Sequence, residues 1–522
     1  MRLFVCACLS LTSLLLCRSP LLGQTSGQAC GGPPNYCANS TRKLVPETPM
    51  APPPVNSPFR DPNFGSRMIR VTDAKTLDGI PYWGNYLVGI GYHTDSSGEQ
   101  NEWSVFDRRI GQHGGYRFWV VGTNTGMAVP FEMDATTMQV TRLTGKPGSY
   151  LNVTGALPIS GSFSYVNPDI VYGVSGLKLK QYDFATDSMV LLYDFAQCPG
   201  LPDSVDQPGL WYGGLTISGD DTKFSYPLGG EGQNEGSAVV VYDRSANGGA
   251  GVCYWYDSQT GTVGGTHIAT AHVPTNFGIR GLSGAGYVIH DSRLNKGGNI
   301  VRVVKESGND EFFWVPGTTS LTPCVPGPDG DKMVGQYCGG HEAMGYTQLV
   351  NATGFFDDMG IVIHPLANLR DWRLLVTPVP NPPEWTQTTH WSWSDASPSV
   401  AMPVCGSTYV DAIVAGGNGT QNVLTNPVLQ IEGAWDREIL CLATSGPSRV
   451  WRFAHDRATG ASNDNAAISS SFWSEPIGNV SSDGKFYLFS TDWDWSLGTE
   501  KGSYGCPAGG SCRTDVFVVE LH

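Results

Sequence analysis

The sequence predicts an all-β fold made of about seven similar units of short strands, and three observations support this. Charged residues make up only 15% of the 522 residues, whereas Gly (66) and Pro (35) are abundant, which is typical of short strands and turns rather than of long surface helices. Aromatic-rich or alternating runs end repeatedly in the same kind of turn. These turns recur at intervals consistent with a repeat of roughly 50–65 residues.

The N-terminus has the pattern of a secretory signal peptide, predicted over residues 1–23. Arg2 supplies a positive charge, and a mostly apolar run from Leu3 to Cys17 follows. This run is too short to span a bilayer comfortably, so a cleaved signal explains it better than a membrane anchor. No later stretch is long and apolar enough for a membrane span. We therefore expect a secreted or periplasmic protein.

The net charge argues against one class of partner. The chain carries a formal charge of −15, and loss of the signal removes only Arg2 and Arg18, so the mature chain is more acidic still. An acidic protein repels phosphate backbones, which makes nucleic acid an unlikely partner.

Cysteine usage supports export. Three of the 13 cysteines lie in the predicted signal, which leaves an even number, ten, in the mature chain. No C-x-x-C pair or Cys/His cluster has zinc-ligand spacing, so disulfides are favoured over a metal site. The simplest scheme pairs them in sequence order: Cys30–Cys37, Cys198–Cys253, Cys324–Cys338, Cys405–Cys441 and Cys506–Cys512.

A Pro-rich segment, "VPETPMAPPPVNSPFRDP", follows the signal. Proline favours an extended, semi-rigid chain. We interpret residues 24–66 as a disordered leader outside the core, which leaves residues 67–522 as the structured domain.

The recurring turn has the form Asp-x-x-Thr. Asp accepts a hydrogen bond from the backbone two residues on, and Thr or Gly completes the turn, as in a strand hairpin. The four copies are Asp134 and Thr137, Asp183 and Thr186, Asp257 and Thr260, and Asp456 and Thr459.

A second recurring turn indicates a family. "VSSDGKFYLFS" near the C-terminus and "ISGDDTKFSYPL" at residues 217–228 both run apolar, Ser, x, Asp, then Lys and alternating aromatic residues, the second with one inserted residue. Both resemble the Ser-x-Asp-Gly-Lys strand turns of bacterial exported β-propellers with TolB-like and WD-like repeats.

We therefore predict a β-propeller of seven blades. The last blade is expected to close the ring by pairing with a strand from residues 68–95, which removes the open edge of a linear array. An open β-sandwich pair is the alternative, and the rough periodicity of the turns favours blades over it. The expected blade ranges are 99–145, 160–198, 210–265, 266–318, 336–380, 388–460 and 470–522.

Three histidine-containing stretches stand at the expected starts of three consecutive blades: "GGTHIATAHV", "CGGHEAMGYTQL" and "TQTTHWSWSD". If the blade registers hold, these histidines converge at the mouth of the central channel. The predicted ligands of a divalent metal such as Mn, Zn or Ca are His267, His272, His341, Glu342 and His390. The alternative is that each histidine hydrogen-bonds to the backbone of a neighbouring blade.

The same stretches resemble the oligogalacturonate lyases, seven-bladed propellers that hold a divalent metal through histidines. "GGHEAMGY" is similar to that family's His-Glu-aromatic stretch, with Ala343 in place of the aromatic residue. "THWSWSD" is similar to a second stretch of the family, and the order of the two stretches along this chain is the reverse of their order in the family. The resemblance implies that a metal neutralises a uronate carboxylate while a base removes the adjacent proton and the glycosidic oxygen leaves by β-elimination. Arg280 is the candidate catalytic base or carboxylate clamp.

Tryptophan and acidic residues form a candidate ligand-binding set, because indole faces stack on sugar rings and carboxylates bind hydroxyls. Its members are Trp391, Trp393, Asp395, Trp493 and Trp495. For the loop "DWDWSLGTE" the alternative is that its own tryptophans pin it to the core, and we favour that alternative.

Two functional hypotheses follow from the sequence, and a purely structural role in an envelope assembly is also open. The favoured one is a secreted propeller that binds a glycan or protein ligand without chemistry. The other is a metal-assisted polysaccharide lyase. Because a propeller fold alone specifies no reaction, the sequence leaves open whether the chain is an enzyme.

Overall fold

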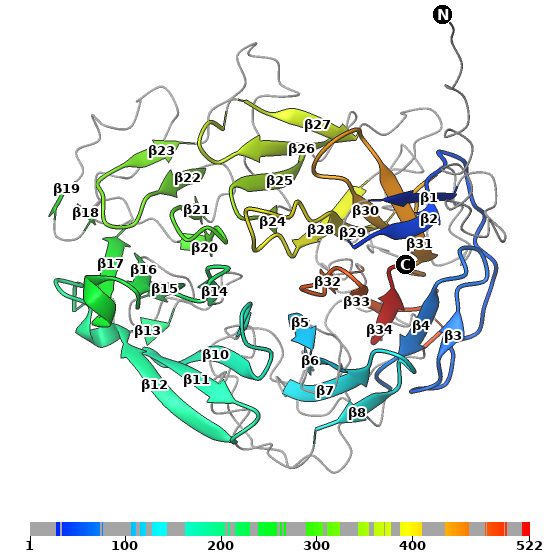
Figure 1. Ribbon diagram of the computed structural model, residues 1–522, viewed down its shortest axis with the longest axis horizontal. Coiled ribbons are helices and arrows are strands. Elements are labelled where there is room, and N and C mark those ends of the chain that lie inside the picture. The colour runs from blue at the N-terminus through cyan, green and yellow to red at the C-terminus, as the bar shows by residue number, and fades with distance from the viewer. Residues whose placement is uncertain are drawn as a thin grey trace, which may run out of the picture.

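The chain is a ring of seven antiparallel sheets, which confirms the predicted β-propeller (Figure 1). It is known from a computed structural model that describes residues 28–31, 34–73, 76, 106–110, 115–121, 128–143, 162–203, 207–208, 215–229, 238–257, 262–263, 266–267, 289–305, 311–323, 343–353, 360–369, 371–376, 387–409, 434–458, 476, 478–494, 496–497 and 514–522. Within these ranges the helical elements are two short 3₁₀ turns, η2 (Phe195–Gln197) and η3 (Asn247–Gly249). Within the same ranges, no helix is long and apolar enough to cross a membrane.

Each of blades 1, 2, 4 and 5 is a four-stranded sheet. Blade 1 contains β5 (Phe106–Ile110), β6 (Gly115–Val121), β7 (Ala128–Asp134) and β8 (Val140–Arg142). Blade 2 contains β9 (Ser162–Phe163), β10 (Ile170–Ser175), β11 (Lys178–Asp183) and β12 (Ser188–Asp194). Blade 4 contains β20 (Ile289–Leu294), β21 (Val301–Lys305), β22 (Glu311–Trp314) and β23 (Leu321–Pro323). Blade 5 contains β24 (Ala343–Met344), β25 (Gln348–Thr353), β26 (Gly360–Pro365) and β27 (Arg373–Val376).

The other three blades carry extra strands. Blade 3 contains β13 (Gln207–Pro208), β14 (Thr216–Ile217), β15 (Lys223–Gly229), β16 (Ala238–Asp243), β17 (Val252–Asp257), β18 (Thr262–Val263) and β19 (Thr266–His267). Blade 6 contains β28 (Gln387–Trp393), β29 (Val404–Tyr409), β30 (Glu438–Leu442) and β31 (Val450–His455), extended outward by β2 (Tyr36–Asn39) and β1 (Gln28–Gly31). Blade 7 contains β32 (Gly478–Val480), β33 (Phe486–Thr491) and β34 (Asp515–Glu520), followed by β4 (Arg67–Arg70) and β3 (Phe59–Arg60).

Ring closure occurs as predicted, through pairing of the two ends of the chain. Strand β4 pairs antiparallel with β34, with Ile69 opposite Val518 and Met68 opposite Val519. At the end of this ladder the Arg67 guanidinium donates to both carboxylate oxygens of Glu520, at 2.7 Å each. The blade that completes the ring therefore takes strands from both ends of the sequence, so no linear sheet edge remains at the seam.

The hydrophobic core lies between blades and not inside any one of them. One cluster, for example, joins Ile69 of β4, Phe118 of β6 and Phe486 of β33, and so fills the space between blades 7 and 1. Similar clusters join blades 2 and 3, 3 and 4, 5 and 6, and 6 and 7. Each buried apolar side chain stabilises the fold by about 1.5–3 kcal/mol, and here that gain depends on a neighbouring blade.

The predicted turns form as their residues require. The Asp134 carboxylate accepts hydrogen bonds from the backbone N–H groups of Thr136 and Thr137, and Asp183 accepts from Ala185 and Thr186 in the same way. In the second turn type the hydroxyl of Ser481 accepts from the N–H groups of Lys485 and Phe486. The turns at Asp257 and Asp456 extend into residues outside the described ranges.

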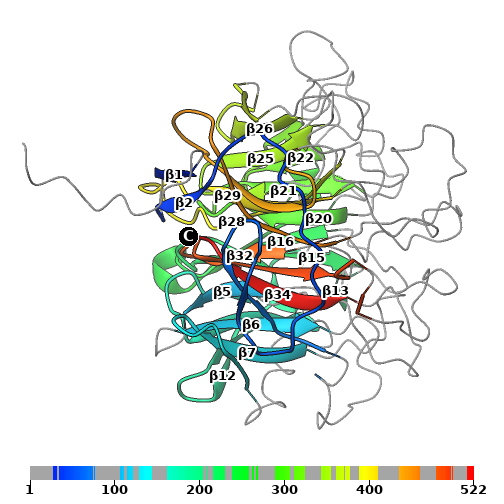
Figure 2. The same cartoon turned by 90° about the vertical axis from the view of Figure 1, so that its right-hand side faces the viewer.

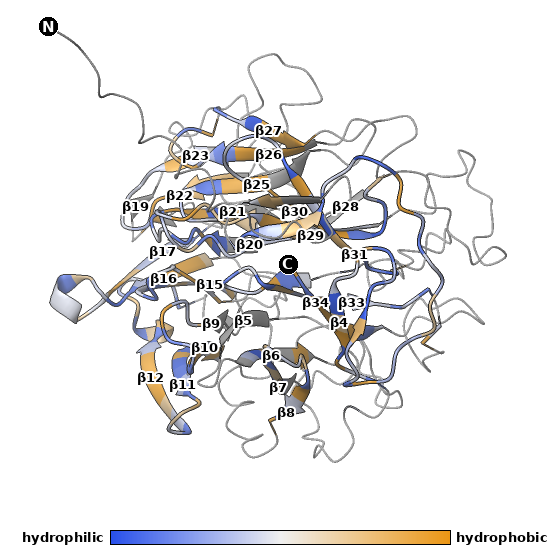
Figure 3. Ribbon diagram, turned by 45° about the vertical axis from the view of Figure 1, so that its right-hand side comes forward, coloured by the Kyte–Doolittle hydropathy of each residue, from blue (hydrophilic) through white to orange (hydrophobic). Residues whose placement is uncertain are grey.

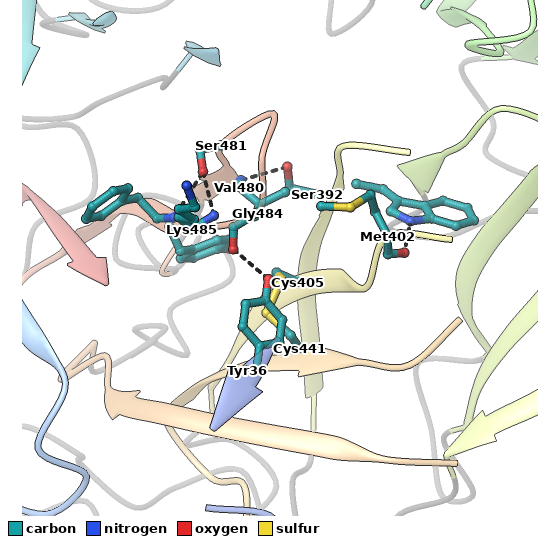
Figure 4. The surroundings of a disulfide bond; sticks show 12 residues. Tyr36, Ser392, Met402, Cys405, Cys441, Val480, Ser481, Gly484 and Lys485 are labelled. Carbon is teal, nitrogen blue, oxygen red and sulfur yellow. Dashed lines mark hydrogen bonds between the residues drawn. A yellow bond between two sulfur atoms is a disulfide. The ribbon is translucent and has the colours of Figure 1, made fainter. Parts of the chain in front are cut away.

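Three of the five predicted disulfides are present: Cys30–Cys37, Cys198–Cys253 and Cys405–Cys441. The other four cysteines, at 324, 338, 506 and 512, lie outside the described residues. The Cys405–Cys441 bond joins directly opposed residues of β29 and β30. Figure 4 shows it beside Tyr36, whose hydroxyl donates to the carbonyl oxygen of Gly484 at 2.7 Å.

The described residues of the leader, 28–31 and 34–66, are ordered, contrary to the expectation of a disordered segment outside the core. Strands β1 and β2 extend blade 6 beyond β31, and β3 extends blade 7. Tyr36 is only 1% exposed and belongs to the core cluster between blades 6 and 7. Proline does keep the leader extended, but its aromatic and acidic side chains meet partners that are remote in sequence, which composition does not reveal.

The outer edge of blade 2 differs from those of blades 6 and 7, which strands of the leader extend. Strand β12 forms the outer edge of blade 2, and its Met189, Val190 and Leu191 are 42–54% exposed. Figure 3 shows this strand as predominantly hydrophobic along the rim of the molecule.

Candidate functional site

The innermost strand of each blade leads into a turn at one end of the ring axis, here called the turn end. Within a blade, neighbouring strands run in opposite directions. The innermost strands of the blades run in the same direction along the axis, so they end at the turn end and begin at the opposite end. The side view in Figure 2 shows the stack of blades whose strands connect the two ends. Two regions can therefore hold an axial site, and the turn end is the better described.

Blades 2 and 3 are joined at the turn end by a buried carboxylate. Asp221, with no exposed surface, lies in the turn between β14 and β15. It accepts hydrogen bonds from the hydroxyl of Ser164 and from the backbone N–H of Tyr165, both in the neighbouring turn of blade 2. The hydroxyl of Tyr172 also donates to it, at 3.2 Å. A buried carboxylate with three donors is well satisfied without water, so this contact positions the two turns.

Backbone hydrogen bonds continue the chain of contacts from blade 3 to blade 5. The N–H of Gly219 donates to the carbonyl oxygen of Lys296 at 2.6 Å. The N–H groups of Lys296 and Gly297 then donate to the carbonyl oxygens of Gly345 and Tyr346, at 2.9 and 3.1 Å. The turns after β14, β20 and β24 are thus tied edge to edge.

Lys296 extends this network to blade 6. Its ammonium group donates to the carbonyl oxygen of Met344 at 2.6 Å and to that of Trp393 at 2.5 Å. It also lies 5.9 Å from the centre of the Tyr165 ring of blade 2. One cation therefore contacts three other blades, and hydrogen bonds to a charged donor are stronger than neutral ones.

Asp395 is the acidic member of this group. It is 6% exposed, and its carboxylate accepts the backbone N–H of Tyr346 at 2.9 Å. Burial raises the pKa of Asp395, and the Tyr346 N–H and the nearby Lys296 charge partly oppose that rise. Asp395 was predicted from the sequence to bind a ligand. In the structure, its hydrogen bond with Tyr346 ties blade 6 to blade 5.

The turns of opposite blades also touch. A Cβ atom at Gly219 of blade 3 would lie only 2.3 Å from the carbonyl oxygen of Ala396 in blade 6, so only glycine permits this approach. Blades 3 and 6 are three positions apart in a ring of seven, so this contact crosses the axis. Together with the hydrogen bonds of Lys296, it links the turns of blades 3, 4, 5 and 6 at the turn end.

Hydrogen bonds and ion pairs complete the circuit through blades 6, 7, 1 and 2. The hydroxyl of Ser392 accepts the N–H of Val480 at 3.0 Å, and Tyr116 donates to Asp483 at 2.8 Å. Arg117 then donates to Asp169 of blade 2 at 2.7 Å. We call the described contacts of the turn end, centred on Lys296 and Gly219, the axial hub.

The described tryptophans predicted to bind a ligand are part of the core. Trp391 and Trp393 are 5% and 4% exposed and pack between blades 5 and 6. Trp493 has no exposed surface; Phe517 stacks on its ring at 4.5 Å and Arg457 lies over it at 5.0 Å. A stacked sugar needs an open indole face, so this geometry fits the pinned-loop alternative for Trp493. Trp495 lies outside the described residues.

The two predicted metal ligands that the structure describes, His267 and His390, lie at different depths in their blades. His267 lies in β19, the outermost strand of blade 3, so the prediction that it begins blade 4 is wrong. The reason is that a short extra hairpin, β18–β19, ends blade 3, and the innermost strand of blade 4 starts only at Ile289. His390 lies in β28, an innermost strand, at a bulge between Thr388 and Trp391.

The remaining candidates, His272, Arg280, His341 and Glu342, lie outside the described residues. Within the described part of the chain no cluster of three or more His, Cys, Asp or Glu side chains has the arrangement of a metal site. His364, which the described ranges include, is 5% exposed, and its Nδ1 contacts the carbonyl oxygen of Leu369 at 2.8 Å. Burial lowers its pKa, which suits a neutral structural histidine.

Among the residues of the axial hub, the sequence analysis singled out Trp393 and Asp395 as candidate ligand-binding residues but neither Lys296 nor Gly219. "GDD" at residues 219–221 was recognised only as part of a strand turn, and Lys296 lies in the unremarked stretch "LNKGGN". The sequence did contain one indication of their role, which is their position: Gly219 and Lys296 each come shortly after an innermost strand.

Comparisons with known proteins found similar solved structures, all at low sequence identity. Similar solved structures include the oligogalacturonate lyase of Vibrio parahaemolyticus, at 12% identity and a TM-score of 0.46 over 89% of this chain and 96% of that one. An oligogalacturonate lyase in complex with manganese matches at 14% identity and 0.44, over 91% and 98%. TolB from Acinetobacter baumannii matches at 13% identity and 0.23, over 49% and 50%. No family model and no curated protein matches the sequence.

Proposed function

We propose that the chain is an exported propeller that binds a glycan or protein ligand at the end of the ring axis where the innermost strands begin, here called the entry end. The observation that carries the proposal is the axial hub, because the contacts of Lys296, Gly219 and Ala396 cross the axis at the opposite end. A ligand that uses the axis then has one end left to approach.

The polar residues singled out from the sequence precede innermost strands in chain order. His341 and Glu342 come directly before β24, and Arg280 comes before β20. These residues are the candidates that the proposal takes from the sequence for the site. The three disulfides support the export part of the proposal, since such bonds persist in oxidising compartments.

The test compares variants at the two ends of the axis. His341→Ala and His390→Ala alter two histidines singled out from the sequence, and Ser399→Ala, an exposed residue of the β28–β29 turn, is the control at the turn end. Binding of polygalacturonate, of a neutral glucan and of an array of further glycans is measured by titration calorimetry and surface binding, with circular dichroism to verify the fold.

We expect at least a tenfold weaker affinity for both histidine variants and an unchanged affinity for Ser399→Ala. Unchanged binding in both histidine variants, or loss in the control alone, contradicts an entry-end site. If no glycan binds, the same variants are compared for capture of a protein ligand.

The alternative function is a metal-assisted lyase acting on uronate polysaccharides. One arrangement favours it: His341 and Glu342 precede β24, His390 lies in β28, and these two innermost strands contact one another. His267, on the outer rim, does not fit such a set, and we derive no chemical step through a metal.

Metal analysis of the mature protein and ultraviolet absorbance after incubation with polygalacturonate decide between the two functions. A stoichiometric divalent ion with release of unsaturated products supports the lyase. Less than about 0.2 ion per chain, with no such product, leaves ligand binding alone.

A further inference from the structure

The leader forms an ordered strap across the seam of the ring. From blade 6, Arg452 donates to the carbonyl oxygens of Thr41 and Lys43, at 2.8 Å each. Further along, Trp493 of blade 7 donates to the carbonyl oxygen of Met50 at 2.9 Å. Asn56 then accepts the backbone N–H of Val140 in blade 1 at 2.7 Å. We call residues 41–56 the strap, because they contact the three blades on both sides of the closing strand.

The strap carries one acidic side chain into a charged cluster. Glu47, whose side chain is 10% exposed, lies 3.0 Å from the guanidinium of Arg457 and 3.5 Å from that of Arg437. Asp494 pairs with Arg437 and lies 3.6 Å from Arg457. Asp456 has no exposed surface, and its carboxylate accepts the N–H of Ala458.

Two carboxyl groups of this cluster contact each other while the strap is bound. The guanidinium groups of Arg437 and Arg457 face Glu47 and Asp494, whereas Asp456 is fully buried and is favoured in its neutral form. Glu47 and Asp494 form a hydrogen bond with each other, and a hydrogen bond between two carboxyl groups requires a proton on one of them.

We infer that the strap binds with a proton on Glu47, and that Glu47 with Asp494 forms a pH-sensitive clasp that holds the leader on blades 6 and 7. The carboxyl group of Glu47 then donates within the cluster, while Asp494 stays ionised against Arg437. Asp494, whose side chain is 30% exposed, gives the proton a route to solvent.

The electrostatics agree with this assignment. Burial raises the pKa of Glu47 to about 7, against the lowering effect of Arg437, and the neighbouring Asp494 adds to the rise. For Asp494, burial acts upward, but the Arg437 charge and hydrogen bond outweigh it, so its pKa lies below the usual value. Burial also raises the pKa of Asp456 well above its usual range.

The direction of the pH effect follows from linkage. Glu47 in a released strap has an ordinary pKa, and in the bound strap the pKa is raised, so strap binding takes up a proton between the two values. Its contribution is fully present below the ordinary pKa of about 4.5 and is lost as the pH rises to about 7. The strap is therefore held most firmly in acid and loosens toward neutral pH.

Other titratable groups pack against the clasp. Asp61 of the leader is buried and accepts three backbone N–H groups, and burial raises its pKa. Burial, followed by the charges of Arg437 and Arg457, lowers the pKa of His455 to about 3, so it stays neutral. Glu438 forms a fully buried pair with Arg452, and burial raises its pKa to about 7. Because Glu438 titrates in a similar range, only substitution of Glu47 itself separates the two.

The test measures hydrogen exchange of residues 41–56 in the full chain from pH 5 to 8, corrected for the intrinsic exchange rate. In the native sequence, protection of the strap should fall by up to about tenfold per pH unit between pH 5 and 7 and then level off. Glu47→Gln places a permanently neutral group there that still accepts from Arg457, so its protection should be high and independent of pH.

Two further variants make the result decisive. Asp494→Asn removes the second carboxyl group of the Glu47–Asp494 hydrogen bond, so it should also flatten the pH profile. Glu132→Gln, which alters a separate ion pair with Arg117 in blade 1, should keep the native profile. A flat profile in the native sequence, or the native slope in Glu47→Gln, overturns the clasp. Thermal melting of each variant verifies that the propeller remains folded.

Discussion

The ammonium group of Lys296 in blade 4 donates a hydrogen bond to the carbonyl oxygen of Trp393 in blade 6, two blades away. Adjacent blades of a propeller bury their apolar faces against each other, but non-adjacent blades meet only near the axis. This hydrogen bond therefore belongs to the axial hub, and it has consequences for stability that can be measured.

Lys296→Met should destabilise the fold. The substitution keeps the length of the side chain but removes the donor for the Met344 and Trp393 carbonyl oxygens, and it also removes the charge beside Asp395. Loss of two charged hydrogen bonds in a half-buried site costs about 2–4 kcal/mol. Urea unfolding measures this loss. The control is Lys485→Met, because that lysine side chain is 58% exposed, and its variant should stay within about 0.5 kcal/mol of the native sequence.

Trp493 should prove to be a core residue. Trp493→Ala removes a fully buried ring that stacks on Phe517 and should cost about 3–5 kcal/mol in the free energy of unfolding. Trp493→Phe keeps an aromatic ring but loses the hydrogen bond to Met50, so its cost should be smaller, about 1–2 kcal/mol. If Trp493→Ala instead weakened glycan binding and left the stability unchanged, the ring would have the sugar-stacking role.

The closing strand should give the fold a pH-dependent contribution of the opposite sign to that of the clasp. The hydrogen bonds from Arg67 lower the pKa of Glu520. Stabilisation by Glu520 is therefore present above its ordinary pKa and is lost as the pH falls through the lowered value. Glu520→Gln should cost about 1 kcal/mol at pH 7, and this cost should disappear once the pH has fallen below the lowered pKa. Asp203→Asn, an exposed acid, is the control, and a cost for Glu520→Gln that persists unchanged in acid would contradict the pairing.

The repeat was accessible from the sequence because its turns depend on local chemistry. Asp134 and Ser481 hydrogen-bond to backbone N–H groups within five residues, so the residues that form each turn lie within a short stretch of sequence. The pairing of β4 with β34 was also predictable, since a ring needs a strand to close it. Local cysteine pairing was confirmed at three places for a similar reason.

The candidate site was less accessible. The sequence placed His267 at the start of blade 4, but the β18–β19 hairpin carries it to the outer rim. Trp493 and Trp391 are equally suited to a sugar site or a core by residue type, and only burial separates these roles. Lys296 carried no recognisable motif, because its partners are carbonyl oxygens of two other blades.

By itself, the sequence determined the seven-bladed ring, its turns and its local disulfides, because hairpin turns and alternating strands are written within short segments. The tertiary structure alone decided that contacts cross the axis at the turn end, that the leader is a strap, and that Glu47 meets Arg437 and Arg457. Those contacts join residues roughly 400 positions apart in the chain or in non-adjacent blades. Their energies depend on burial and on charges brought in from several blades, and neither quantity exists until the ring has closed.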